Sequence, residues 1–212
     1  MSSEPFIRLQ NVVVHRGSFC LKIQELCVNQ GESIGIIAPS GRGKSTLLML
    51  LAGLLPASEG QISVRGVDPF AQTAKWRARQ VAWLGSTLEL PEDLLVHEQL
   101  KLAAHLIPQT PPTAESILAT LNHLGLDGFE KRTMASLSTG QQQRVALGRV
   151  LLHPSSLRLA DEPTAALDDG WADRCGDLLL DRTHRPTVCF ASHDAQLIKK
   201  ADRVISPDGE PA

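Results

Sequence analysis

The sequence lacks an apolar run long enough to cross a bilayer. Its longest such stretch, Leu47 to Leu55, is about half of the roughly 20 residues that a spanning helix needs, and it contains Gly53. It therefore predicts a buried helix, and we expect no membrane span in this chain. The residues from Met1 to Pro5 lack a basic start followed by an apolar run, so we also expect no secretory signal and a cytoplasmic location.

Cysteine is scarce and irregularly spaced. The four cysteines are Cys20, Cys27, Cys175 and Cys189, and none of them forms the C-x-x-C spacing typical of zinc sites. Their sequence neighbours are mostly apolar. The pattern favours reduced thiols in the core over a zinc site or a set of disulfides.

An excess of charge of one sign is also missing. The chain has 21 lysines and arginines against 23 aspartates and glutamates, a formal net charge of -2. Such a balance leaves no polybasic footprint, so nucleic acid is not an expected partner, although a local basic patch stays open. With 42% hydrophobic residues among 212, the chain can bury one core, and we expect a single domain over residues 1–212.

Short β-rich runs alternate with helical patterns along the chain. Alternating apolar and polar residues predict half-exposed strands over Phe6 to Val14 and Cys20 to Leu26, and an apolar run predicts a buried strand over Ser33 to Ala38. Later predicted strands span residues 61–65, 81–85, 157–161, 187–192 and 203–206. This alternation predicts an α/β fold with a largely parallel sheet.

From about residue 93 to 152 the pattern is helical. One predicted helix carries its apolar residues on a single face, namely Val96, Leu100, Ala103, Ala104 and Ile107. A second predicted helix, stopped by Gly125, does the same with Ile117, Leu118, Leu121 and Leu124. The linker from Pro108 to Pro112 separates the two, and together they predict a small helical subdomain.

A glycine-rich loop connects the third predicted strand to a helix expected to start near Lys44. Gly41 and Gly43 let backbone N–H groups converge on phosphate oxygens, and the helix N-terminus adds the positive end of its dipole. The context of a buried strand before and a helix after is the one that a phosphate-binding loop requires. The predicted nucleotide-binding residues of the loop are Ala38, Pro39, Ser40, Gly41, Arg42, Gly43, Lys44, Ser45 and Thr46.

The last residues of this loop have separate predicted roles. Lys44 would reach the β- and γ-phosphates, Ser45 would bind Mg²⁺, and Thr46 would contact the α-phosphate. The usual motif opens with glycine, and the alanine at Ala38 is tolerable if its φ is below zero. The alternative is a glycine-rich turn that binds nothing, and the loop alone does not separate kinases, GTPases and transport ATPases.

Two further motifs narrow the choice. L-S-T-G-Q, from Leu137 to Gln141, is similar to a family signature, L-S-G-G-Q, and A-D-E-P-T runs from Ala160 to Thr164. With these motifs in this order, the chain from about residue 6 to 206 resembles the ATP-binding subunits of ABC transporters. The resemblance implies a P-loop NTPase core, an N-terminal antiparallel β subdomain and an inserted helical subdomain. A-D-E-P-T and the stretch from Leu95 to Glu98 look like the branch serving lipoprotein release and macrolide export.

The resemblance implies that two subunits share each site. In the family the signature meets the γ-phosphate held by the other subunit, so the implied unit is a head-to-tail dimer with two ATP molecules at its seam. Ser138, Gly140 and Gln141 are the matching residues here. Capping of the helix by Ser138 is compatible with this role, because capping and anion binding use the same donors.

Adjacent carboxylates end the predicted strand at 157–161. By the resemblance, Asp161 would hold Mg²⁺ and Glu162 would polarise the attacking water as general base. Two neighbouring carboxylates there are costly unless a cation neutralises them, and a solvated acidic turn is the alternative. Arg158 is unusual in this strand and indicates that one of its faces is less buried.

Two later residues match family positions that read the nucleotide. His193 ends a buried run about 30 residues after Glu162 and resembles the switch histidine that contacts the γ-phosphate, although a lone histidine at a strand end is more often structural. Asp168 matches the loop that crosses to the partner subunit.

The family pattern breaks at two positions. Ser86 stands where the family has a glutamine, and its hydroxyl cannot copy the reach of an amide or its donor and acceptor pair. The usual adenine platform is a tyrosine, and this chain has none. His15 and Arg16 occupy that region, where Arg16 could stack on adenine or be a solvated loop charge.

The sequence therefore predicts an ATP-hydrolysing subunit with ATP and Mg²⁺ as cofactors. Its partners would be a separate integral membrane permease and a second ATPase subunit, identical or paralogous, at the cytoplasmic face of the inner membrane. The alternative is a regulatory clamp that dimerises on ATP but hydrolyses it poorly. Ser86 favours the clamp, whereas Glu162 and His193 argue for hydrolysis.

Overall fold

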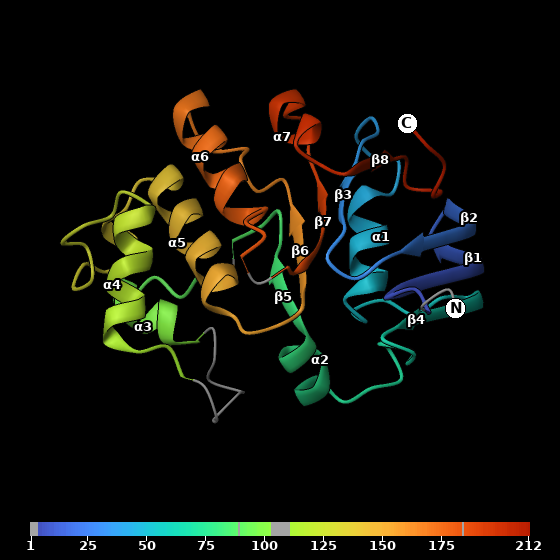
Figure 1. The fold of residues 1–212 in the computed structure, drawn as a ribbon, viewed down its shortest axis with the longest axis horizontal. Helices are drawn as coiled ribbons and strands as arrows, with labels where there is room; N and C mark the ends of the chain where they lie inside the picture. Colours follow the sequence, from blue (N-terminus) through green and yellow to red (C-terminus); the bar gives the residue numbers. More distant parts are fainter. Residues whose placement is uncertain (1–3, 89, 103–110, 184) are drawn as a thin grey trace.

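The N-terminal part of the protein forms an antiparallel sheet in the computed structural model, which describes residues 4–88, 90–102, 111–183 and 185–212 (Figure 1). β1 (Ile7–Arg16) pairs with β2 (Phe19–Val28) on one edge and with β4 (Glu59–Val64) on the other. Successive side chains of β1 and β2 largely alternate between buried and exposed, with most of the apolar ones on the buried face, as a half-covered sheet requires. Arg16, expected in a loop, is the last residue of β1.

The second sheet is parallel in every described strand pair. Its order is β5-β6-β7-β3-β8, so the first of these strands in the chain lies between the last two. Its strands are β3 (Ser33–Ile36), β5 (Val81–Leu84), β6 (Leu157–Asp161), β7 (Thr187–Ala191) and β8 (Arg203–Ile205). These two sheets confirm the α/β prediction with an antiparallel β subdomain.

The register of the parallel sheet aligns three strand ends. Ala191 lies beside Ile36 on one side and beside Asp161 on the other. Because the strands are parallel, the segments that follow them leave the sheet at one edge. This edge is the place where open α/β sheets bind ligands.

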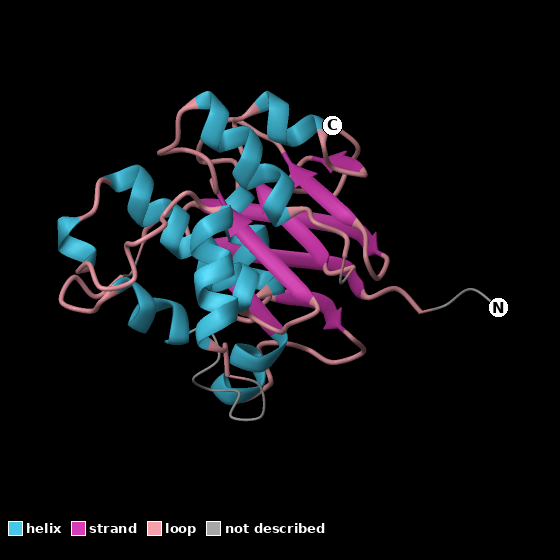
Figure 2. Cartoon of the chain, turned by 60° about the vertical axis from the view of Figure 1, so that its left-hand side comes forward, coloured by secondary structure: helices cyan, strands magenta, loops and turns pink. Residues whose placement is uncertain are grey.

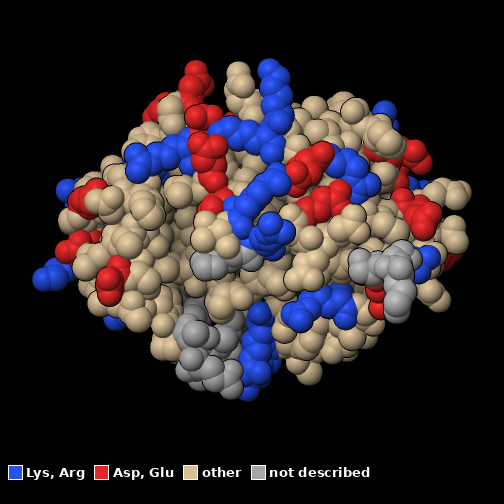
Figure 3. All heavy atoms as spheres, viewed as in Figure 1, with Lys and Arg blue, Asp and Glu red and all other residues tan. Residues whose placement is uncertain are grey.

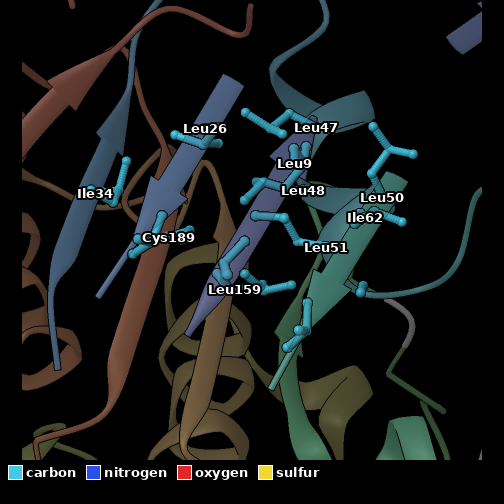
Figure 4. Packing of buried hydrophobic residues seen from close by; sticks show 14 of the residues in the cluster. Leu9, Leu26, Ile34, Leu47, Leu48, Leu50, Leu51, Ile62, Leu159 and Cys189 are labelled. Carbon is cyan, nitrogen blue, oxygen red and sulfur yellow. The ribbon is translucent and has the colours of Figure 1, made fainter. Parts of the chain in front are cut away.

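Helix α1 (Lys44–Leu51) is buried between the two sheets. Leu47, Leu48, Leu50 and Leu51 are at most 1% exposed. In Figure 4 their side chains lie among Leu9, Leu26 and Ile62 of the antiparallel sheet and Ile34, Leu159 and Cys189 of the parallel sheet. Each buried leucine stabilises the fold by about 1.5–3 kcal/mol. The N-terminus of α1 is thus fixed against both sheets, but the predicted buried stretch is too long, since Leu54 is 53% exposed.

The remaining helices surround the parallel sheet, and α3, α4 and α5 gather at one end of the molecule (Figures 1 and 2). They pack into a second apolar cluster with the sheet, which includes Val96, Leu100 and Val145. Their bounds are α2 (Ala74–Gln80), α3 (Val96–Lys101), α4 (Ala114–His123), α5 (Thr139–Leu152), α6 (Asp169–Leu179), α7 (Ala195–Lys199) and the 3₁₀ turn η2 (Met134–Ser136).

The predicted apolar face of α4 needs one correction. Ile117, Leu121 and Leu124 are buried, but Leu118 is 54% exposed, because it follows Ile117 by one position and points about 100° away from it. The predictions for Ala103, Ala104 and Ile107, and for the linker from residue 108 to 110, lie outside the described residues. The helical subdomain remains a prediction.

Arg158 is buried, so the prediction of a less buried face on β6 is wrong. All five residues of the strand are buried, and Arg158 is only 7% exposed. Its Nη1 donates to the carbonyl oxygen of Leu179 at 3.1 Å, at the C-terminal end of α6, where the helix dipole favours a cation. Burial nevertheless lowers the pKa of Arg158 below its usual value, because the charged form loses hydration.

The cysteines are free thiols, but only two belong to the core. Cys175 and Cys189 are buried, and burial raises their pKa to about 11 and about 12, so both are protonated at neutral pH. Cys20 is exposed and Cys27 is partly buried, which corrects the prediction for these two residues.

Charges of both signs share the face shown in Figure 3, where lysine and arginine side chains lie beside aspartates and glutamates. Within the described ranges, no helix has both the length and the apolar character that crossing a membrane demands.

Candidate functional site

The loop between β3 and α1 has the backbone that a phosphate cradle requires. Gly41 and Gly43 have φ values of 77° and 97°, which favour glycine. A Cβ on Gly43 would lie 2.9 Å from Cζ of Phe19, so a side chain there would collide with the ring. Ala38 is not among the non-glycine residues with positive φ, so alanine fits that position without strain.

No side chain caps the N-terminus of α1, where Gly43 is the N-cap residue. Helices normally satisfy their first N–H groups with a side-chain oxygen. Here the N–H groups of the first turn and the dipole end are available to an anion, which fits a bound phosphate group.

Lys44 lies at the start of α1 and is 7% exposed. Its Nζ donates to the carbonyl oxygen of Ala38 at 2.8 Å and lies 2.9 Å from Nε2 of His193. With the ammonium as donor, Nε2 of His193 accepts. The cation is thereby held at the mouth of the loop, where phosphates would lie.

The acidic pair lies beside this lysine. Asp161, the last residue of β6, is 2% exposed. Glu162 follows with φ of 52°, its N–H donates to the carbonyl oxygen of Ala191 at 2.9 Å, and its Oε2 accepts from the N–H of His193 at 3.2 Å. Oε1 of Glu162 is 3.6 Å from Nε2 of His193. Residues more than a hundred positions apart thus converge because β3, β6 and β7 end together.

These groups face one open cavity of about 1320 Å³. The volume suffices for a ligand larger than a typical drug molecule. The predicted site residues that line it are Arg16, Ser40, Gly41, Arg42, Gly43, Lys44, Ser45, Thr46, Asp161, Glu162 and His193. Ser86 lines it too, whereas Ala38 contributes a carbonyl oxygen beside it.

Sequence patterns missed some residues of the cavity wall. Phe19 packs against Gly43 from the start of β2, and Thr164 donates to Oδ2 of Asp194 at 3.2 Å. Phe19 stands in no quoted motif, and Thr164 ends the A-D-E-P-T motif, in which only Asp161 and Glu162 had a predicted role.

The signature segment lies outside the cavity. Ser138 is exposed and caps α5: its Oγ accepts from the N–H of Gln141 at 3.3 Å, and Oε1 of Gln141 accepts from the N–H of Ser138 at 3.0 Å. A Cβ on Gly140 would lie 2.9 Å from the carbonyl oxygen of Ala166, so glycine allows a close approach between the first turn of α5 and the segment before α6. Ser138, Gly140 and Gln141 therefore form a surface separate from the phosphate loop of their own chain.

Asp168 caps the next helix. Its Oδ1 accepts from the N–H of Trp171 at 3.0 Å, at the start of α6, and the residue is exposed. Within this chain its role is structural, and its position on the surface leaves it accessible to another subunit.

The oxygen donors of the cavity fit Mg²⁺. Ser45 and Asp161 provide a hydroxyl and a carboxylate, ligands that this hard cation prefers. In the part of the chain that the structure describes, no three His, Cys, Asp or Glu residues cluster as a metal cage. Mg²⁺ usually takes one or two protein ligands together with substrate phosphates and water, and Ser45 and Asp161 can supply those ligands.

Comparisons with known proteins agree on one family. A family model described as ABC transporter matches residues 21–165. The uncharacterised ABC transporter ATP-binding protein YbbA of Escherichia coli K12 is 38% identical over 189 residues, covering 85% of this chain and 82% of that protein. The lipoprotein-releasing system ATP-binding protein LolD of Legionella pneumophila is 32% identical over 192 residues, covering 87% and 85%. The post-hydrolysis dimer of the ATP-binding cassette MJ0796 with ADP and Pi has a TM-score of 0.80 at 26% identity, covering 97% and 96%.

Proposed function

The chain belongs to the ABC transporter family of ATP-binding proteins, and from this premise we propose that it hydrolyses ATP to drive substrate movement by a separate membrane permease. The observation that carries the proposal is the division of its motifs. Lys44, Asp161, Glu162 and His193 converge in one cavity, while Ser138 lies on a different surface. Two copies arranged head to tail would bring the two halves together.

The phosphate loop would bind the nucleotide. Backbone N–H groups at the start of α1 and the ammonium of Lys44 neutralise the β- and γ-phosphates, and Thr46 contacts the α-phosphate. Ser45 and Asp161 hold Mg²⁺, which supplies positive charge at the phosphates when bound. Binding breaks the contact between Lys44 and His193, because a phosphate oxygen replaces Nε2 as the partner of the ammonium.

Glu162 would act as the general base. Its carboxylate accepts a proton from the water whose oxygen attacks the γ-phosphorus, and the bond to the β-phosphate oxygen breaks, leaving ADP and inorganic phosphate. His193 would hold the γ-phosphate, since its ring already lies between Lys44 and Glu162. The N–H of His193 steadies the carboxylate at 3.2 Å.

The second half of each site would come from a partner copy, identical or paralogous. Ser138, Gly140 and Gln141 at the start of α5 direct a hydroxyl and N–H groups toward the γ-phosphate held by the partner. Asp168 lies at the start of α6 and would face the same seam.

The permease would dock near Ser86, which follows the end of β5 by two residues and lines the cavity wall. The subunit would then lie on the cytoplasmic face of the inner membrane. The similarity to LolD, whose name assigns it to lipoprotein release, supports an assignment to the branch that includes lipoprotein release and macrolide export.

A complementation experiment tests the shared site. Lys44→Ala removes the phosphate-binding cation, and Ser138→Arg blocks the signature surface, so neither variant alone should hydrolyse ATP. A mixture should regain about a quarter of wild-type turnover, because half of randomly mixed head-to-tail dimers carry one intact site out of two. Turnover is measured with and without the co-purifying permease. If the mixture hydrolyses no ATP while wild type is active under the same conditions, the head-to-tail dimer is refuted.

A regulatory clamp is the second candidate. Ser86 favours it, because a short exposed hydroxyl replaces the family's amide at the position that senses both nucleotide and partner. The clamp predicts ATP-dependent dimerisation with slow turnover that the permease does not stimulate. Stimulation by the permease would exclude it.

A further inference from the structure

Helix α5 sends one side chain to the backbone of the acidic pair. Gln143 lies one turn into the helix and is 5% exposed. Its Nε2 donates to the carbonyl oxygen of Pro163 at 2.9 Å and lies 3.4 Å from the carbonyl oxygen of Glu162. A buried amide that bonds two adjacent carbonyl groups fixes the course of the chain between them.

The backbone that it fixes is strained. Glu162 has φ of 52°, a region that costs a residue with a side chain about 1–2 kcal/mol. Such a conformation persists only where the surroundings hold it. The N–H of Glu162 is held by Ala191 at the end of β7, and its carbonyl side is held by Gln143.

The direction of the carboxylate depends on this conformation. A change of φ or ψ at Glu162 rotates the bond from Cα to Cβ and moves the carboxylate by more than the backbone itself moves. In the observed conformation, Oε2 accepts a hydrogen bond from the N–H of His193 at 3.2 Å. A general base must stay within hydrogen-bond reach of the water that it deprotonates.

We propose that Gln143 is a positioning residue for hydrolysis, whose buried amide holds Glu162 in its left-handed conformation and so aims the carboxylate at the nucleotide. The inference rests on the proposed function and deepens it. The amide touches neither the cavity nor the reacting atoms. Because α5 starts with the signature segment, the same amide also connects the surface that faces the partner's nucleotide to the base that acts on the chain's own nucleotide.

Gln142 provides a matched control. It is the neighbouring residue with the same side chain, and its Nε2 also bonds backbone carbonyl groups, those of Met134 at 3.0 Å and Leu137 at 3.5 Å. Its contacts remain in the segment before α5 and do not include the acidic pair.

Gln143→Met keeps the length of the side chain and removes the donor. We expect its kcat to fall by about ten- to a hundredfold, since a misplacement of about 1 Å costs up to about a hundredfold, while its Kd for ATP changes by less than about twofold. Gln142→Met should keep kcat within about threefold. Equal kcat values for the two variants, or a parallel loss of kcat and ATP affinity in Gln143→Met, would overturn the proposal.

A double-mutant cycle with Glu162→Gln separates positioning from general damage. If Gln143 acts through the carboxylate of Glu162, adding Gln143→Met to Glu162→Gln should change the residual rate by less than about twofold. If the double variant instead loses kcat by the product of the two single losses, the proposal is refuted. An inactive wild type would instead contradict the proposed function, so the two failures are distinct.

Gln143→Asn replaces Gln143→Met if the latter does not fold. It keeps the amide but withdraws it by one carbon, and we expect a smaller loss of kcat that again disappears in the Glu162→Gln background. A loss that persists there would count against the proposal.

Discussion

Two helices of this molecule start with phosphate-binding motifs, but their N-termini differ. The start of α1 lies in a large cavity, is held between two sheets, and has no side-chain cap. The start of α5 lies on the surface, and a reciprocal pair of hydrogen bonds between Ser138 and Gln141 caps it. One N-terminus is therefore ready for an anion, whereas the other is already capped within its own chain.

The difference indicates how the work is divided. An uncapped helix end has unpaired N–H groups and the positive end of the helix dipole, and a phosphate of the nucleotide can bind there directly. At the capped end, a phosphate must share the hydroxyl of Ser138 with the N–H of Gln141, so we expect this end to contribute less to affinity and only when a partner supplies the phosphate. We therefore expect substitutions at the start of α1 to affect nucleotide binding and substitutions at the start of α5 to affect turnover.

The largest expected effect belongs to the cavity side. Glu162→Gln should lower turnover by about a hundred- to ten-thousandfold, because the proposed general base is lost, while ATP binding persists. The ATP-loaded variant should sediment as a dimer, since the nucleotide is no longer consumed. Glu115→Gln on the exposed start of α4 should behave as wild type. A Glu162→Gln protein that hydrolyses ATP normally would mean that another group takes the proton.

The signature side should respond next. Gly140→Ala adds a Cβ that lies 2.9 Å from the carbonyl oxygen of Ala166, so the segment must shift. A shift of this kind should lower turnover by about tenfold and leave the Kd for ATP of the single subunit nearly unchanged.

Gly170→Ala is the matched control for that substitution. Its added Cβ would lie 3.5 Å from Oδ1 of Asp168, an ordinary contact, and its turnover should stay near that of wild type. If Gly140→Ala weakened nucleotide binding by the single subunit as strongly as it lowered turnover, the distinction between the two helix ends would fail.

The smallest expected effect concerns the nucleotide base. Arg16 lies at the cavity rim near Phe19, where a guanidinium can stack on a purine ring. Arg16→Ala should weaken ATP and GTP binding alike by about two- to fivefold, because stacking on a ring face does not read the base edges. Titration of both nucleotides measures this, with Arg8→Ala on the exposed face of β1 as control. If the affinity for both nucleotides stays unchanged, Arg16 does not contact the base and is a solvated surface charge.

Local patterns predicted much of the site, because its chemistry follows the chain. The phosphate loop, the acidic pair and the capped signature are each short segments whose residue types state their hydrogen-bonding role. The α/β fold followed from the alternation of strands and helices, and the comparisons confirm it.

What the sequence did not predict depends on contacts between distant segments. Phe19 meets Gly43 and Gln143 meets Pro163 only after the chain folds. We predicted a less buried face at Arg158 because burial of a guanidinium is costly. No local pattern predicts that the carbonyl oxygen of Leu179, at the end of α6, accepts its hydrogen bond. Leu118 was misplaced because an apolar residue adjacent to a buried one was counted on the same face.

The position of β3 has a consequence for how the chain folds. This strand lies early in the sequence, yet its two neighbours are β7 and β8, the last two strands of the described residues. Contacts between such distant segments slow folding. During synthesis, the strand that supports the phosphate loop must therefore wait until β7 and β8 have been made before it acquires its flanking strands. A nascent chain shortened at residue 180 should lack a nucleotide-binding loop in its native form, even though every residue of that loop is already present.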